Sequence, residues 1–277
     1  ANVPDIPGLE TFAGRWYHTG QWPHEGVDFT GKRVGQIGTG STGIQAAPVI
    51  AAQAAHLTVF QRTANYSVPA RNAPLSPEFL RWTKENHAEI RRVMRSTTNG
   101  HPFTISERSA LGAAPEERRA IYEAAWEKGG LQFRAAFQDI LTDKAANETA
   151  AEFIRAKIRG IVKDPETAAK LTDFDHPFAA KRPPIDTEYF ETFNRPNVSL
   201  VDVRASPIER ITPRGIKTRD AEHGLDIIVF ATGFDAMTGP LLRMDIRGRG
   251  GRPLREAWEA GPRTYLGLQV PGFPNLF

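Results

Sequence analysis

The sequence predicts an α/β fold in which a parallel sheet is interrupted by a long helical segment. Three observations support this prediction. A short apolar stretch, 33–37, passes through a glycine-rich turn into a helical run. Residues from about 76 to 175 then show helical periodicity and helix-start signals. Two later stretches, 198–203 and 225–230, are apolar enough to be buried parallel strands.

Composition places the chain among ordinary globular proteins. It has 277 residues, of which 40% are hydrophobic and 24% charged. The lack of cysteine excludes disulfides and thiolate metal sites, so we expect a cytoplasmic protein. A net charge of +3 without any Lys/Arg-rich run argues against nucleic acid as a partner. No apolar run approaches the ~20 residues that cross a bilayer, so we also expect no membrane association.

The glycine-rich turn after the first strand is the strongest local signal. It has the pattern G-x-G-x-x-G, in Gly38-Thr39-Gly40-Ser41-Thr42-Gly43, and leads into the helical run 44–53. The first glycine permits a tight turn, the second lets the backbone approach a pyrophosphate, and the third lets helix and strand pack closely. The helix N-terminus adds free N–H groups for the phosphates. A purely structural turn is the alternative, but the strand–turn–helix context favours a Rossmann-like dinucleotide site formed by these six residues.

The next strand, 56–60, indicates which dinucleotide binds. In an NAD site, an acidic residue about 20 residues after the loop accepts the ribose 2′-hydroxyl. This chain has Gln61, Arg62 and Thr63 there instead. A guanidinium group pairs well with a 2′-phosphate, so the site should prefer NADP(H). The alternative is that Arg62 only extends from the strand end into solvent.

The middle of the chain carries the signals of several helices. Ser76 before Pro77 is a typical helix cap followed by a first-turn proline. Pro115 is placed equally well to begin a helix, and Asp164 before Pro165 repeats the capping pattern. We therefore expect this segment to be all-helical.

Two apolar stripes at helical spacing support the same prediction. One consists of Phe133, Phe137, Ile140 and Leu141, and the other of Ala150, Phe153, Ile154 and Ile158. We expect both to be core positions rather than cofactor contacts, with Gly129-Gly130 ending the helix before them. The seven histidines show no metal-ligand spacing, so we expect no metal site.

A further motif lies before the first strand. Phe12, Gly14, His18, Trp22 and Pro23 stand in the spacing F-x-G-x-x-x-H-x-x-x-W-P. In isolation, an aromatic segment with a single histidine is usually packing. Just before a dinucleotide-binding turn, it resembles the fingerprint of type I Baeyer–Villiger monooxygenases, flavoenzymes that insert one oxygen atom of O2 beside a ketone carbonyl. The resemblance places His18 and Trp22 at a domain hinge.

The resemblance covers essentially the whole chain and implies four parts. Residues 1–70 would be the first part of a Rossmann-like NADP-binding domain, 71–178 an all-helical insertion, and 179–231 the second part of that domain. After the A-T-G that begins at Ala231, residues 232–277 would start the return to a FAD-binding domain. We therefore expect the chain to be an internal fragment, incomplete by itself, with FAD-domain segments outside it.

The same resemblance implies roles for single residues. Arg62 and Thr63 match positions that hold the 2′-phosphate, and Lys181 matches a lysine that joins them. Arg182 matches the catalytic arginine. From the residues alone, a Lys-Arg pair before prolines such as Lys181-Arg182 is most simply a solvated loop, and the resemblance reverses that interpretation. Because Pro183 favours extended geometry, the two adjacent side chains should point to opposite sides and serve two different charges.

The implied activity needs FAD, NADPH, O2 and a small-molecule ketone. NADPH would reduce FAD, O2 would then give a C4a-peroxyflavin, and attack on the carbonyl would yield an ester or lactone. Arg182 would stabilise the anionic peroxide. Two alternatives stay open. One is an N- or S-oxidising flavin monooxygenase, whose related fingerprint lacks the Trp22-Pro23 ending, and the other is a flavin-free NADP-binding module or dehydrogenase.

Overall fold

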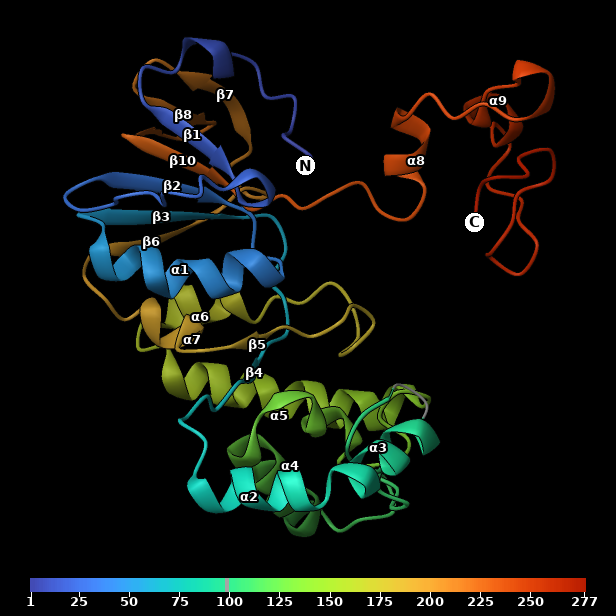
Figure 1. The fold of residues 1–277 in the computed structure, drawn as a ribbon. Coiled ribbons are helices and arrows are strands. Elements are labelled where there is room, and N and C mark those ends of the chain that lie inside the picture. Colours follow the sequence, from blue (N-terminus) through green and yellow to red (C-terminus); the bar gives the residue numbers. More distant parts are fainter. Residues whose placement is uncertain (98–99) are drawn as a thin grey trace.

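The centre of the protein is a five-stranded sheet, seen edge-on in Figure 1. The computed structural model describes residues 1–97 and 100–277. The strands are β1 (Arg15–His18), β2 (Arg33–Ile37), β3 (His56–Gln61), β6 (Val198–Asp202) and β10 (Ile227–Phe230). They lie in the order β1-β10-β2-β3-β6, and every neighbouring pair is parallel. The predicted α/β fold with a parallel sheet is confirmed, whereas the edge strand β1 was not expected from its four aromatic and polar residues.

Different layers cover the two faces of this sheet. Helix α1 (Ser41–Gln53) covers one face and packs on α7 (Tyr189–Thr192). A small antiparallel sheet of β7 (Ile208–Thr212), β8 (Gly215–Thr218) and β9 (Glu222–Gly224) lies on the other. The side chains of β10 alternate between these layers: Ile227 and Val229 join the core with α1, and Ile228 and Phe230 join the core with the small sheet.

The segment between β3 and β6 contains several helices besides α7 (Figure 1). They are α2 (Pro77–Glu85), α3 (His87–Ser96), α4 (Pro115–Lys128), α5 (Lys144–Ile161) and α6 (Pro165–Leu171). The expected caps are present, because the side chains of Ser76 and Asp164 accept hydrogen bonds from the backbone N–H groups of Phe79 and Thr167 at 3.1 and 2.8 Å. Helix α4 begins at Pro115 and is capped at its end by Gly129, as expected.

One expected helix is wrong. The stripe that begins at Phe133 lies in a 3-10 turn, η3 (Gly130–Ala135), followed by bends at 136–139. The reason is that this stretch bonds to a neighbouring loop rather than to itself. The Asp139 carboxylate accepts hydrogen bonds from the Ala110 N–H at 2.9 Å and the Ser109 hydroxyl at 2.6 Å. Three of the four stripe residues are still buried, while Leu141 is 49% exposed.

A short pair of strands ties the helical layer to the main sheet. Strand β4 (Val68–Pro69), where the chain enters that layer, pairs in parallel with β5 (Ile185–Asp186), where it leaves. The buried Ser67 hydroxyl donates to the Asp186 carboxylate beside this pair. The two crossings are therefore fixed to each other, although they are more than a hundred residues apart in the sequence.

The last part of the chain stands apart from the main body. After β10 an extended stretch leads to α8 (Gly239–Arg243) and α9 (Leu254–Ala257), which lie to one side in Figure 1. These helices and the turns after them form a small core of their own around Trp258 and Phe273. Within residues 1–97 and 100–277, no helix is long and apolar enough to cross a membrane.

Candidate nucleotide site

The glycine-rich turn follows the carboxyl end of β2, which lies between β10 and β3 in the sheet. The chain proceeds from β2 to β3 on one side of the sheet and returns to β10 on the other. This reversal of strand order is where parallel α/β sheets bind ligands. Gly38 has a φ of 111°, and a Cβ there would lie 2.5 Å from the Ala231 carbonyl oxygen. A Cβ on Gly43 would lie 2.2 Å from the Gly38 carbonyl oxygen, so both positions require glycine.

Gly40 has open space where the other two glycines have none. A Cβ on Gly40 would meet no atom within 4 Å. Gly40 is also the N-cap of α1 and provides no side-chain cap, so Ser41 and Thr42 present the first N–H groups of a thirteen-residue helix. Both residues are exposed. This arrangement fits a pyrophosphate, which needs close backbone approach and free N–H donors at a helix N-terminus.

Gln36 of β2 stabilises the turn through hydrogen bonds, a role that the sequence did not reveal. Its side-chain amide is fully buried and donates to the carbonyl oxygens of Gly38 and Gly43 at 3.2 and 3.1 Å. The turn is thereby held at both ends before any ligand binds. A polar residue inside an otherwise apolar strand was the only signal for this role.

The end of β3 is joined directly to the turn. The Thr39 hydroxyl donates to the Thr63 carbonyl oxygen at 2.8 Å. This contact sets Arg62 and Thr63 next to the glycine turn, as the motif spacing requires. Arg62 is exposed, and no hydrogen bond or ion pair involves its side chain in the part of the chain that the structure describes. Its guanidinium group is therefore available to an anion.

Thr63 and Lys181 are brought together through an aspartate. The Thr63 hydroxyl donates to Asp175 Oδ2 at 3.3 Å, and Lys181 Nζ lies 3.8 Å from Asp175 Oδ1. His176 Nδ1 lies 2.7 Å from the same Oδ1. The predicted phosphate residues from opposite ends of the helical segment therefore meet at one place. Asp175 was missed because nothing in its local sequence marks it.

Arg182 belongs to a different environment. It is exposed, and none of the described residues forms a hydrogen bond or ion pair with its side chain. Burial lowers the pKa of His101 in the helical segment, and the charges of Arg134 and Arg182 lower it further. Lys181 contacts Asp175 and Arg182 does not, and the expectation that the two cations serve different charges stays a prediction.

The loop that carries both cations is anchored by Asn147 of α5. Asn147 is buried, and its amide donates to the carbonyl oxygens of Ile140 and Phe178, each at 2.8 Å. Its carbonyl oxygen accepts from the Phe178 N–H at 2.9 Å. The next residue, Ala179, has a φ of 63°, a conformation that costs an alanine of order 1 kcal/mol or more. The helical segment therefore determines where Lys181 stands.

The fingerprint residues lie at the link to the last part of the chain. His18 ends β1 beside Phe230 of β10, and its ring packs edge-to-face on Phe234 at 5.9 Å. Its Nδ1 accepts from the Gly20 N–H at 3.0 Å. Trp22 contacts Tyr17 at 5.8 Å between ring centres and remains 37% exposed. His18 therefore contacts the stretch where the chain leaves the sheet, whereas Trp22 packs on Tyr17 of β1.

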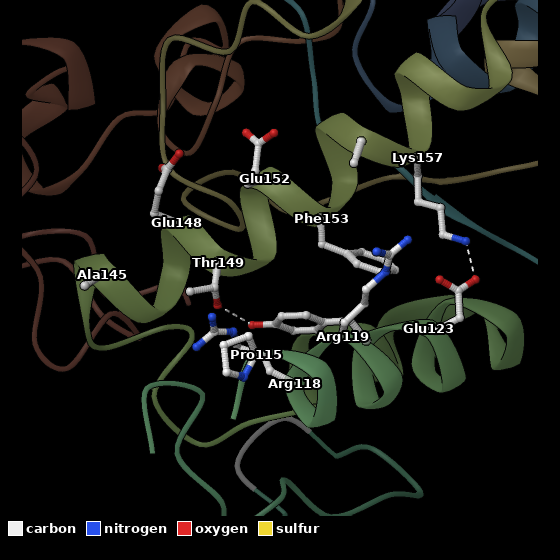
Figure 2. Close-up of a pocket in the computed structure, with 12 residues that line it drawn as sticks. Pro115, Arg118, Arg119, Glu123, Ala145, Glu148, Thr149, Glu152, Phe153 and Lys157 are labelled. Atoms are coloured by element: carbon white, nitrogen blue, oxygen red, sulfur yellow. Dashed lines mark hydrogen bonds and ion pairs between the residues drawn. The ribbon is translucent and has the colours of Figure 1, made fainter. Parts of the chain in front are cut away.

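A groove in the helical segment is separate from these residues. A groove of about 610 Å³ runs between α4 and α5, with Phe153 in its wall and charged side chains at its rim (Figure 2). Glu123 and Lys157 pair across it, and Tyr122 is hydrogen-bonded to Thr149 at 2.8 Å. No residue of the predicted nucleotide site lines this groove. Within the described ranges, no group of three or more His, Asp or Glu side chains is arranged to hold a metal ion.

Comparison with known proteins connects this geometry to monooxygenases. No protein-family model matches the chain. The chain is 48% identical over 280 residues to a Baeyer–Villiger monooxygenase of Pseudooceanicola batsensis, covering 100% of this chain and 51% of that protein. It is 46% identical over 278 residues to the phenazine N-monooxygenase PhzNO1 of Lysobacter antibioticus, covering 99% and 51%.

Solved structures give the same result in three dimensions. Oxidized steroid monooxygenase bound to NADP matches with 55% identity and a TM-score of 0.93, over 100% of this chain and 53% of that one. OTEMO in complex with FAD and NADP matches with 46% identity and a TM-score of 0.95, over 100% and 53%. The chain spans about half the length of the curated relatives it matches. Over all its residues, it is similar to Baeyer–Villiger monooxygenases.

Proposed function

We propose that this chain is the NADP-binding part of a Baeyer–Villiger monooxygenase. In this proposal residues 1–70 and 179–231 form a Rossmann-like NADP-binding domain, 71–178 are its helical insertion, and 232–277 begin the return to a FAD-binding domain. The sheet order, the glycine turn at the strand reversal and the separate last part support this division. The likeness to structures that hold FAD and NADP supports the cofactors.

The observation that carries the proposal is the group of donors beside the glycine turn. Arg62 is free, and Thr63 and Lys181 meet at one carboxylate, so three donors surround the place where an NADP 2′-phosphate would lie. Gly40 and the first turn of α1 would hold the pyrophosphate. NADPH supplies a hydride when bound, and these residues fix its position and select the phosphorylated form.

Substitution of Arg62 tests this assignment. Loss of a charge-assisted contact to phosphate costs on the order of 1.5 to 3 kcal/mol, so Arg62→Ala should raise the KM for NADPH roughly ten- to a hundredfold. The KM for NADH should change little. Arg195→Ala is a matched control, because Arg195 is exposed and lies before the amino end of β6, whereas Arg62 follows the carboxyl end of the neighbouring parallel strand β3. Equal weakening with both coenzymes would show that Arg62 is structural.

We assign Arg182 to the reacting centre. Unlike its neighbour Lys181, it does not contact Asp175, and Pro183 and Pro184 are buried immediately after it. A cation at this position would stabilise negative charge that develops during oxygen transfer. Within the complete protein, insertion of one oxygen atom of O2 beside a ketone carbonyl to give an ester or lactone is the activity that we propose.

A second candidate is N-oxygenation, because a phenazine N-monooxygenase is as similar to the chain as the ketone enzymes are. Incubation of the complete protein with NADPH, O2 and either a cyclic ketone or a phenazine would separate the two. Ester or lactone from the ketone supports our proposal, whereas N-oxide alone supports the alternative. Segments such as 60–63 and 261–268 resemble phenylacetone monooxygenase, and this finer assignment stays a prediction.

A further inference from the structure

Asp175 is the unexpected member of the phosphate site. An acidic side chain stands between Thr63 and Lys181, two residues that should hold a dianionic phosphate. Its carboxylate accepts from the Thr63 hydroxyl at 3.3 Å and lies 3.8 Å from Lys181 Nζ. The carboxylate therefore occupies the same donors that the proposed ligand would use.

The position of Asp175 is fixed by its neighbours along the chain. Phe174 stacks on Tyr66 at 3.7 Å between ring centres, and the His176 ring packs edge-to-face on the same tyrosine at 5.5 Å. His176 is largely buried, and its Nδ1 donates to the Asp175 carboxylate at 2.7 Å. This hydrogen bond lowers the pKa of Asp175, which stays ionised at neutral pH. Aromatic packing on both sides thus holds the charge beside the proposed site.

We propose that Asp175 sets the degree of coenzyme selectivity, by competing with the NADP 2′-phosphate for Lys181 and Thr63. The inference rests on the proposed function of the site. With NADP(H), the phosphate must replace the carboxylate at these donors and lie near its charge. With NAD(H), the carboxylate is an acceptor for the free 2′-hydroxyl, as an acidic residue is in NAD-specific sites. Asp175 therefore weakens the preference that Arg62 and Lys181 create.

The test compares two probes that differ only in the 2′-phosphate. The dissociation constants of 2′,5′-ADP and 5′-ADP are measured by calorimetry on the complete protein and on Asp175→Asn. The amide keeps an oxygen acceptor for His176 and has nearly the same shape. We expect 2′,5′-ADP to bind roughly two- to fivefold more tightly to the variant, since the Asp175 carboxylate is 43% exposed and solvent weakens such pairs. 5′-ADP should bind no more tightly.

Asp173→Asn is the matched control. Asp173 lies two residues away, is 65% exposed and pairs with Arg204 outside the site. Asp173→Asn removes the same charge as Asp175→Asn, so a general electrostatic effect on 2′,5′-ADP binding would appear in both variants. A gain of 2′,5′-ADP binding in Asp175→Asn alone supports competition. Equal gains in the two variants would overturn it.

A second substitution shows whether the effect passes through Lys181. In a Lys181→Ala background, Asp175→Asn should give a smaller gain, because the contested cation is gone. If Asp175 instead positions Lys181, Asp175→Asn by itself weakens 2′,5′-ADP binding, and that result overturns the inference. A wild-type protein that does not prefer 2′,5′-ADP to 5′-ADP would overturn the proposed NADP site itself.

Discussion

Asn147 offers the sharpest test of how the helical segment supports the proposed nucleotide site. Its side chain makes three hydrogen bonds, to the carbonyl oxygens of Ile140 and Phe178 and from the Phe178 N–H. Asn147→Ala removes all three and leaves these backbone groups buried without partners. Phe178 is three residues before Lys181, so the substitution releases the loop at its anchor.

The expected magnitude follows from those contacts. A buried backbone group left without a partner costs about 1 to 3 kcal/mol, and the three losses share one cavity, so we expect about 2 to 4 kcal/mol of lost stability in total. Displacement of Lys181 should remove about 1.5 kcal/mol from 2′-phosphate binding. This corresponds to roughly tenfold weaker binding of NADP⁺. The glycine turn is unaffected, so binding of NAD⁺ should stay unchanged.

The assay has two readouts and a matched control. Urea unfolding gives the loss of stability, and calorimetry under conditions where the variant is folded gives the two dissociation constants. Asn194→Ala is the control, because Asn194 also accepts from a backbone N–H, that of Lys163, and donates to a backbone carbonyl, that of Ile161, each at 2.8 Å. It should lose stability without losing NADP⁺ selectivity. An Asn147→Ala protein that is destabilised but binds NADP⁺ normally would refute the coupling.

Three further predictions concern the turn, the fingerprint and the reacting centre. Gly40→Ala should fold normally, since Gly40 has a φ of −80° and a Cβ there meets open space, but calorimetry should show weaker nucleotide binding. Gly38 has a φ of 111°, so Gly38→Ala should lower the free energy of unfolding in urea by about 1 to 3 kcal/mol. Burial lowers the pKa of His18 below its unfolded value, so the unfolded state binds a proton more readily and stability should fall as the pH drops below about 6.5. The loss of stability should be smaller in His18→Asn. Arg182→Ala in the complete protein should slow ester formation at least a hundredfold, which is a loss of about 3 kcal/mol of transition-state stabilisation. The KM for NADPH, measured from the rate of NADPH oxidation, should stay normal.

Local signals predicted the glycine-rich turn and the elements around it well. The strand before it, the helix after it and the strand that carries Arg62 depend on neighbouring residues only, namely three glycines and short apolar runs. The helix caps at Ser76 and Asp164 are local for the same reason. Such elements are specified within about ten residues, so one sequence is enough to find them.

Elements that depend on distant partners were missed. Strand β1 exists because β10, more than two hundred residues later, pairs with it. The stripe from Phe133 matches a helix, but Asp139 bonds to a loop about thirty residues away and the backbone follows that contact. Asn147 and Asp175 act across 31 and 112 residues, on Phe178 and Thr63. No spacing rule links such pairs, so only the folded structure identifies them.

The proposed phosphate site would therefore be a product of two layers. Arg62 and Thr63 come from the end of β3, and Lys181 comes from a loop fastened to α5. Neither layer alone assembles the three donors. The β4–β5 pair and the contact between Ser67 and Asp186 hold the layers at a fixed distance. Because binding of a 2′-phosphate draws on both, anything that shifts the helical layer should change NADP(H) affinity before it changes NAD(H) affinity.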